Sequence, residues 1–140
     1  MWVRLSALFR PLTLGRARLP GKWRSHKDAG KKAFRAGNFD EAERHFSAAL
    51  KHVEPMGERT PRAAATLNNL ALVYKRQGKF GKAEICFRRA LRIYETLDPH
   101  HIHVASVLQN LAGLYRVQGK GAEAEPLRTR ARAIVEAGVG

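Results

Sequence analysis

Two asparagines, Asn69 and Asn110, lie 41 residues apart in the similar stretches Leu-Asn-Asn-Leu and Leu-Gln-Asn-Leu. An asparagine amide carries both a donor and an acceptor, so it can pair with the two groups of an extended peptide bond whatever side chains the peptide carries. The alternative is that these amides satisfy polar groups between neighbouring helices, as buried amides commonly do. The sequence leaves both interpretations open.

Basic residues would share a surface with these amides if the chain forms stacked helix pairs, because the first helix of each pair then lines a concave face. These residues are Lys27, Lys31, Arg35, Lys75, Arg76 and Arg116. Such a surface favours an acidic peptide or a C-terminal carboxylate, and the alternative is an ordinary solvated basic surface. The candidate peptide-binding residues are therefore Lys27, Lys31, Asn68, Asn69, Lys75, Arg76, Gln109, Asn110 and Arg116.

Three histidines, His100, His101 and His103, form a cluster that could suggest a metal site. No cysteine or pair of carboxylates stands nearby to complete a tetrahedral site, so we expect loop and helix-capping roles and no metal. Cys86 precedes Phe87 in the sequence, and no paired base is evident that would activate its thiol. We therefore expect Cys86 to be a small core residue. The motifs of hydrolases, metalloproteases and phosphate-binding loops are missing, so we expect neither catalysis nor a cofactor.

The net charge of +14 is concentrated toward the N-terminus, where residues 1–26 hold six basic and no acidic residues. Spaced arginines among apolar residues are typical of a mitochondrial transit peptide, and the alternative is a disordered basic tail. We assign this role to residues 1–24 and expect a mitochondrial location, in the matrix, with the cytoplasm as the alternative. No run of about 18 apolar residues predicts a membrane span.

The rest of the chain repeats with a period of 41 residues. The period links Gly37, Gly78 and Gly119, and three further columns keep the same register: Ala42, Ala83 and Ala124; Glu43, Glu84 and Glu125; Ala49, Ala90 and Ala131. Four columns in one register indicate that the same structural unit is built three times.

Each unit is predicted to form two helices joined by a short turn. In the second unit, Thr60 is a suitable N-cap, Pro61 suits the first helical position, and Gly78 suits the left-handed residue that ends a helix. In the first unit, Ser25 with Asp28 and Asn38 with Glu41 have the spacing of a capping box. The predicted helices span residues 25–36, 39–53, 61–77, 80–97, 102–118 and 121–136, with no strand.

The second and third units carry a family resemblance in the runs LNNLALVYKRQGKFGKAEICFRRALRIYE and LQNLAGLYRVQGKGAEAEPLRTRARAIVE. They resemble tetratricopeptide repeats of the long-period kinesin light chain type. The resemblance implies an all-α fold, a right-handed superhelical solenoid of three helical hairpins over residues 25–138, with repeats at about 23–56, 64–97 and 105–138. It also implies that Asn69 and Asn110 hold the backbone of a bound peptide. The first unit departs from the pattern because Ala29, Gly30 and Ala33 replace the expected Leu, Ala and Tyr.

The third unit differs from the others at two positions that would face a following repeat. Arg128 stands where the first two units place Phe46 and Phe87, and Arg132 stands where they place Leu50 and Leu91. Burying two unpaired guanidinium groups would cost several kcal/mol. We therefore expect a polar terminal face and no fourth repeat.

Together these features predict a non-catalytic protein-interaction module, a mitochondrial adaptor or assembly factor whose concave groove binds an extended, acidic peptide of another protein. One alternative is a basic helical-repeat RNA-binding protein, which the sequence disfavours because Phe34 alone among the groove positions is aromatic. The other alternative is a structural brace between subunits, acting through its convex or terminal faces.

Overall fold

The computed structural model describes residues 21–56 and 60–139, and residues 1–20, which hold most of the predicted transit peptide, lie outside the described residues. The described part is helical throughout and contains no strand. A leading helix over residues 21–35 is followed by α2 (Phe39–Val53), a 3₁₀ turn η1 (Glu54–Met56), α3 (Pro61–Arg76), α4 (Phe80–Leu97), α5 (Ile102–Val117) and α6 (Gly121–Val139). The predicted helices are confirmed, with differences of a few residues at their ends.

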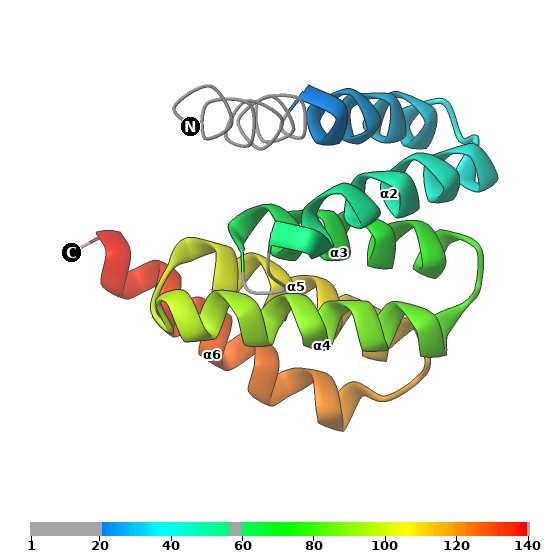
Figure 1. The fold of residues 1–140 in the computed structure, drawn as a ribbon. Coiled ribbons are helices and arrows are strands. Elements are labelled where there is room, and N and C mark those ends of the chain that lie inside the picture. The colour runs from blue at the N-terminus through cyan, green and yellow to red at the C-terminus, as the bar shows by residue number, and fades with distance from the viewer. Residues whose placement is uncertain (1–20, 57–59, 140) are drawn as a thin grey trace, which may run out of the picture.

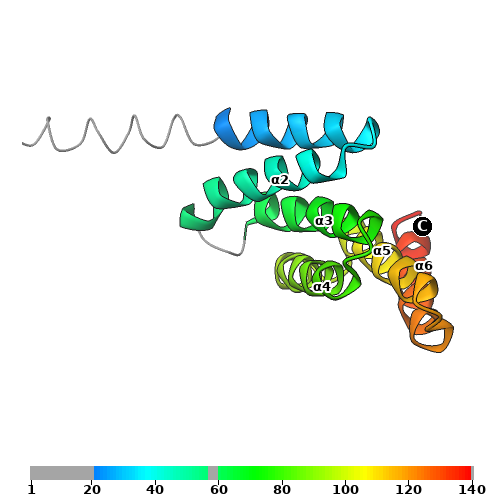
Figure 2. The same cartoon turned by 90° about the vertical axis from the view of Figure 1, so that its right-hand side faces the viewer.

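The helices stack in chain order as three antiparallel hairpins, from the leading helix at one end to α6 at the other (Figure 1). In the view turned by 90°, the directions of the helices change along the stack, so that α5 and α6 run obliquely to the leading helix (Figure 2). From α2 to α6 each helix packs chiefly on its neighbours in the sequence, and α3 also makes a small contact with α5. This arrangement is a helical solenoid.

The turns inside the hairpins repeat the same geometry. Gly37, Gly78 and Gly119 have φ angles of 81°, 76° and 75°, in the left-handed region that glycine adopts without strain. The residue after each glycine donates its backbone N–H to a carbonyl five residues earlier, at 2.9, 2.8 and 2.8 Å. These bonds satisfy the last carbonyls of each first helix and confirm the predicted role of the glycines.

The start of α3 also follows the prediction. The Thr60 hydroxyl accepts a hydrogen bond from the backbone N–H of Ala63 at 3.2 Å, and Pro61 occupies the first helical position. One of the free N–H groups at the helix start is thereby satisfied.

Two predicted caps in the first hairpin are wrong. Ser25 lies inside the leading helix, because the described helix already includes residues 21–24, which the sequence analysis assigned to the tail. Asn38 makes no side-chain capping bond, since the chain enters α2 directly from the glycine turn and Asn38 has φ −87° and ψ 75° instead of an extended conformation.

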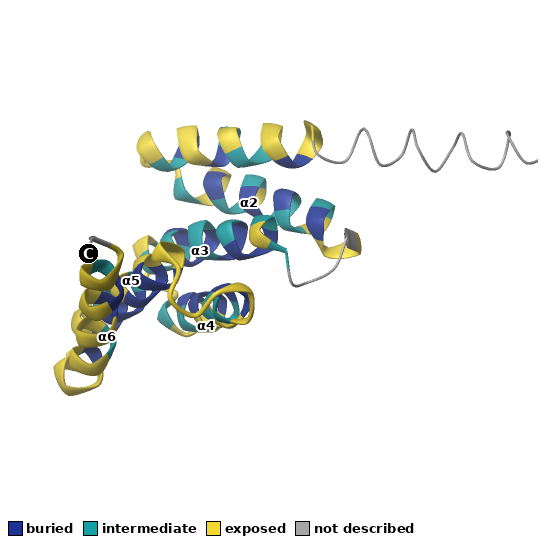
Figure 3. Ribbon diagram, turned by 90° about the vertical axis from the view of Figure 1, so that its left-hand side faces the viewer, coloured by how far each residue is buried: buried dark blue, intermediate teal, exposed yellow. Residues whose placement is uncertain are grey.

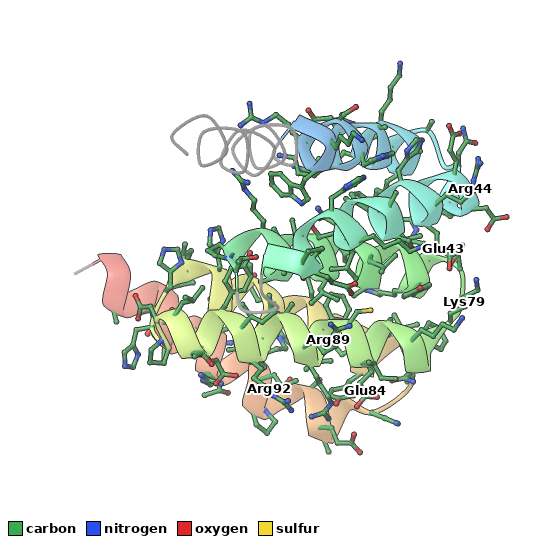
Figure 4. The ribbon with its side chains drawn as sticks, viewed as in Figure 1. Glu43, Arg44, Lys79, Glu84, Arg89 and Arg92 are labelled. Carbon is green, nitrogen blue, oxygen red and sulfur yellow. The ribbon has the colours of Figure 1, made fainter. Side chains whose placement is uncertain are left out.

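The core follows the repeat columns. Leu70 and Leu111 are buried, and the alanines of the two repeated alanine columns are completely buried in all three hairpins. Burial is confined to the inward sides of the helices, while the outer sides of the leading helix and of α6 are exposed (Figure 3). Small side chains in these columns allow the helices to approach closely.

The departure at Gly30 has a packing reason. A Cβ atom at this position would lie 2.8–2.9 Å from three atoms of the Phe46 ring, which is itself 2% exposed. Gly30 is the equivalent, one and two periods back, of Ala71 and Ala112. The first hairpin is therefore closed more tightly at this point than an alanine would permit.

We expect Gly30→Ala to destabilise the domain by about 1–3 kcal/mol, even though alanine is the better helix former by about 1 kcal/mol, because the overpacking against Phe46 outweighs the gain in propensity. The measurement is the free energy of unfolding in urea. Gly21→Ala is the matched control, because its Cβ would meet no atom within 4 Å. Equal effects at the two positions would contradict the explanation.

The leading helix is tied directly to α3. The indole N–H of Trp23 donates a hydrogen bond of 2.9 Å to the Thr66 hydroxyl, which in turn donates to the Arg62 carbonyl at 2.7 Å. Thr66 is fully buried, so this bond satisfies both polar groups away from water. Lys27 and Arg62 lie 4.7 and 5.1 Å from the centre of the indole ring.

Histidines fill part of the interface between the leading helix and α2. The His26 ring stacks on His52 with centroids 5.5 Å apart and lies 5.8 Å from His45. Burial lowers the pKa of His26, and the neighbouring His52, His45 and Lys22 lower it further. The interface thus favours the neutral form of His26.

A tyrosine and a glutamate connect each hairpin to the next. Tyr74 of α3 lies near Glu43 of α2, and the Tyr115 hydroxyl of α5 donates a hydrogen bond to Glu84 of α4 at 2.8 Å. The bond from Tyr115 lowers the pKa of Glu84, with Arg88 adding to the effect. The contact recurs with the 41-residue period.

Candidate functional site

The concave side of the stack contains a cavity of about 180 Å³ between the first two hairpins. It is lined by three residues of the leading helix, one of α2 and two of α3: Lys31, Phe34, Arg35, Phe46, Asn69 and Leu72. The aromatic and aliphatic side chains form an apolar lining, while two cations and an amide can reach a ligand at the rim. Such a cavity suits an apolar side chain presented by a chain that carries acceptors for the cations.

The two predicted asparagines differ in their surroundings. Asn69 lines the cavity, and no side chain in the described part of the chain hydrogen-bonds its amide. The Asn110 amide N–H instead donates to the Asn68 side-chain oxygen at 3.1 Å, which joins α5 to α3. The donor and the acceptor of the Asn69 amide are therefore both available to a ligand. Asn110 and Asn68 each use one amide group in the contact between repeats.

The predicted basic residues are only partly brought together. Lys31 lines the cavity beside Asn69, and the Lys75 amine extends across to α5, where it lies 3.3 Å from the position a Cβ on Gly113 would take. Arg116 is exposed on α5. These side chains leave a cationic rim along the concave face.

Lys27 and Arg76 are engaged with aromatic rings. Lys27 is 23% exposed, pairs with Asp28 at 3.8 Å and lies over Trp23. Arg76 lies 5.7 Å from the ring centre of Phe34 and 5.1 Å from that of Phe39. Arg76 of α3 thereby helps to hold the second hairpin against the first, whereas the contacts of Lys27 lie within the leading helix.

Gln109 belongs to a separate cavity of about 240 Å³, which it lines with Arg128, Arg132 and Val135 of α6. The predicted site is thus divided between the cavity of the first two hairpins and a second cavity beside α6. Phe46 is a lining residue that the sequence did not indicate, because its place in the repeat marks it as a core position.

The histidine cluster lies at the start of α5. His101 is the N-cap, and its Nδ1 accepts a hydrogen bond from the backbone N–H of His103 at 3.2 Å, which confirms a capping role. The His103 ring stacks on Tyr94 with centroids 5.1 Å apart. Over residues 21–56 and 60–139 no group of three His, Cys, Asp or Glu side chains is arranged to hold a metal ion.

Cys86 is buried on α4, and burial raises the pKa of its thiol. A protonated buried thiol is unreactive, in agreement with the prediction of a core residue. Among the helices described, none is both long and apolar enough to cross a membrane.

The sequence from residue 32 to 96 matches the tetratricopeptide repeat family. This region carries tetratricopeptide repeats. The match covers the end of the leading helix and all of α2, α3 and most of α4, and the third hairpin continues the same array with the same turn and the same tyrosine contact. Tetratricopeptide repeats are protein–protein interaction modules, which is the general function of this array.

Three solved structures are similar to the array. BtubC (BKLC) from P. vanneervenii is 26% identical with a TM-score of 0.77, and the alignment covers 84% of this chain and 48% of that one. The TPR domain of Arabidopsis FLU is 19% identical with a TM-score of 0.75, over 85% of this chain and 98% of that domain.

A putative kinesin light chain with nearly identical TPR-like repeats, from Podosopora anserina, is 22% identical with a TM-score of 0.73, over 82% of this chain and 56% of that one. The chain thus spans about half the length of the Podosopora anserina protein and of BtubC. No curated protein sequence matches the chain significantly.

Proposed function

We propose that the array binds an extended peptide segment of another protein along its concave face, with one apolar side chain in the cavity between the first two hairpins. The observation that carries this proposal is the position of the unpaired Asn69 amide at the rim of an apolar cavity. The amide can pair with the peptide backbone while the cavity takes a side chain, so the two contacts together fix the register of the peptide.

The charge of the groove supports an acidic peptide. Lys31 and Arg35 stand at the cavity, and Lys75 and Arg116 continue the cationic rim toward α5. These side chains are exposed or half-buried, so they attract and orient an acidic segment more than they anchor it. A protein that presents such a segment would be recruited by this module, which is the action of an adaptor or assembly factor.

RNA binding is less well supported by the geometry. Phe34 packs edge-on against Phe39, with ring centroids 5.5 Å apart, and lies beneath Arg76. Arg76 thus covers part of this ring, and a stacking platform for successive single-stranded bases requires several free rings.

We expect Asn69→Ala to weaken peptide binding by about 1–3 kcal/mol, because a desolvated peptide group loses its partner, while the free energy of unfolding stays nearly unchanged. The ligand is a peptide selected from a random phage-displayed library on the full chain, and its affinity is measured by fluorescence anisotropy. Asn38→Ala is the matched control, since Asn38 is exposed at a turn and its side chain caps nothing.

A second pair of variants tests the role of charge with the same peptide. Lys75→Glu with Arg116→Glu should slow association and reduce its salt dependence, whereas Arg44→Glu with Lys51→Glu, on the exposed side of α2, should not. If the α2 pair or Asn38→Ala weakens binding as much as the groove variants, the concave face is not the binding surface.

We further propose that the protein acts in mitochondria. A fusion of residues 1–26 to a fluorescent protein should enter mitochondria, and changing Arg4, Arg10, Arg16 and Arg18 to Glu should abolish import because the membrane potential acts on positive charge. Fluorescence microscopy with a mitochondrial marker measures both. Diffuse cytosolic fluorescence of the unaltered fusion would leave the segment as a basic tail.

A further inference from the structure

Within residues 21–56 and 60–139, the outer face of α6 lacks the cover that the equivalent helices have. The second helix of each earlier hairpin packs against the first helix of the next one, α2 against α3 and α4 against α5. In the described part of the chain α6 packs against α5, and Arg130 reaches back to Glu95 of α4 at 2.9 Å. Figure 1 shows α6 at the end of the stack.

The glutamates that recur with the 41-residue period differ in exposure, depending on whether a following helix covers them. The side chains of Glu43 and Glu84 are 25% and 27% exposed because residues of the following hairpin bond each of them, Gln77 and Lys79 for Glu43 and Tyr115 for Glu84. The side chain of Glu125 is 66% exposed. Its ion pair is with Arg128 of its own helix, at 3.2 Å. Glu125 therefore presents, in the same register, an acceptor that the earlier hairpins use to fix the next helix.

Two arginines replace the apolar residues of this face. Arg128 and Arg132 occupy the positions of Phe87 and Leu91 in α4 and, with Gln109 and Val135, line the cavity of about 240 Å³. In the first hairpin the equivalent residue, Phe46, shares its cavity with residues of the following helix, α3. A helix laid on α6 in the same way would place its side chains against two guanidinium groups.

We propose that this face of α6 docks an acidic α-helix of a partner protein, laid where the first helix of a following repeat would lie. Carboxylates on that helix pair with Arg128 and Arg132, and a hydroxyl donor reaches Glu125. Pairing removes the cost of covering the guanidinium groups, which an apolar helix would incur. This surface is distinct from the groove between the first two hairpins.

A second copy of the chain does not fit this site. In a head-to-tail stack the helix presented to α6 would be the leading helix, which carries one acidic residue, Asp28, against six basic residues: Lys22, Arg24, Lys27, Lys31, Lys32 and Arg35. Its exposed side is basic, and like charges across an interface cost several kcal/mol. Charge complementarity therefore selects an acidic partner.

The test uses two synthetic helices derived from α3, the helix that covers α2. Both have the sequence of Pro61–Arg76 with Arg62, Lys75 and Arg76 replaced by Gln, and both carry a lactam staple on the outward side to maintain the helix. In the acidic probe Asn69 and Leu72, which line the cavity with Phe46, are also replaced by Glu. The neutral probe keeps them.

We expect the acidic probe to bind the full chain saturably in fluorescence anisotropy and to shift the backbone amide resonances of α6, while the neutral probe does not. Arg128→Glu with Arg132→Glu should weaken this binding by about tenfold or more. Arg44→Glu with Lys51→Glu, which makes the same change in net charge on α2, should leave it unchanged. A probe with Lys in place of the two Glu residues should bind the Arg128→Glu, Arg132→Glu variant.

Three outcomes would overturn the proposal: no preference for the acidic probe, equal loss with the α2 variant, or resonance shifts confined to the groove. Asn69→Ala of the chain distinguishes the last case, since it should weaken the groove peptide and leave the acidic helix bound. Failure of the groove proposal would not affect this result, because the variants that test the two surfaces share no residue.

Discussion

Phe87→Ala is expected to destabilise the domain by about 3–5 kcal/mol, which is a large fraction of the 5–15 kcal/mol that typically holds a domain together. Phe87 is completely buried in α4 and is among the largest side chains of the core. Removing its ring loses the transfer free energy of the buried area and leaves a cavity that the surrounding helices can fill only in part. The melting temperature should fall by about 10 °C, measured by circular dichroism at 222 nm.

Ile85→Ala is the matched control for this result. Ile85 lies on the same helix two residues away, and 60% of its surface is exposed, so truncation should change the free energy of unfolding by about 0.5 kcal/mol or less. A small effect at Phe87, or similar effects at both positions, would mean that the buried side of α4 has been wrongly placed.

Trp23→Ala should have an effect of similar size, about 3–5 kcal/mol, but should act on the first hairpin. The substitution removes a buried indole, leaves the Thr66 hydroxyl without its donor, and takes away the ring that Lys27 and Arg62 both contact. In a solenoid each repeat contacts only its neighbours, so the loss should loosen the leading helix before α5 and α6. Hydrogen exchange of the backbone amides, resolved by residue, measures this difference.

A double-mutant cycle separates the hydrogen bond from the packing. Trp23→Phe keeps most of the apolar area but not the donor and should cost about 1–3 kcal/mol, because it leaves a buried hydroxyl unpaired. When Thr66→Val is combined with it, the two effects should be less than additive, since the same bond is removed twice. Strict additivity, or unchanged exchange in the leading helix after Trp23→Ala, would contradict this account of how the helix is attached.

Local sequence features predicted most of the fold. The bounds expected for α2 and α4 agree with the structure, and those for α3 and α5 differ by one residue. The reason is that Thr60, Pro61 and the three turn glycines act on their own backbone neighbourhood, where the physical rules need no knowledge of the rest of the chain. The 41-residue period then transfers each local conclusion from one hairpin to the next.

Prediction was poorer where a residue's partner is distant in the sequence. The leading helix includes residues 21–24 because Trp23 is buried and bonded to Thr66, 43 residues away, and no local signal marks that contact. The same holds for Asn110, whose partner Asn68 lies in the preceding hairpin. The sequence analysis treated Asn69 and Asn110 as equivalent because the repeat makes them so.

The sequence by itself determined that the chain forms three helical hairpins, which positions are buried, and that the concave face is basic, because hydrophobic period, turn glycines and charge are properties of neighbouring residues. Only the tertiary structure decided that Asn69 keeps a free amide beside an apolar cavity, that Lys27 and Arg76 are engaged with rings, and that Glu125 with Arg128 is left uncovered on α6. These properties depend on which side chains from different hairpins meet, and a repeat pattern makes equivalent positions look alike until the stacking of the helices gives each one different neighbours.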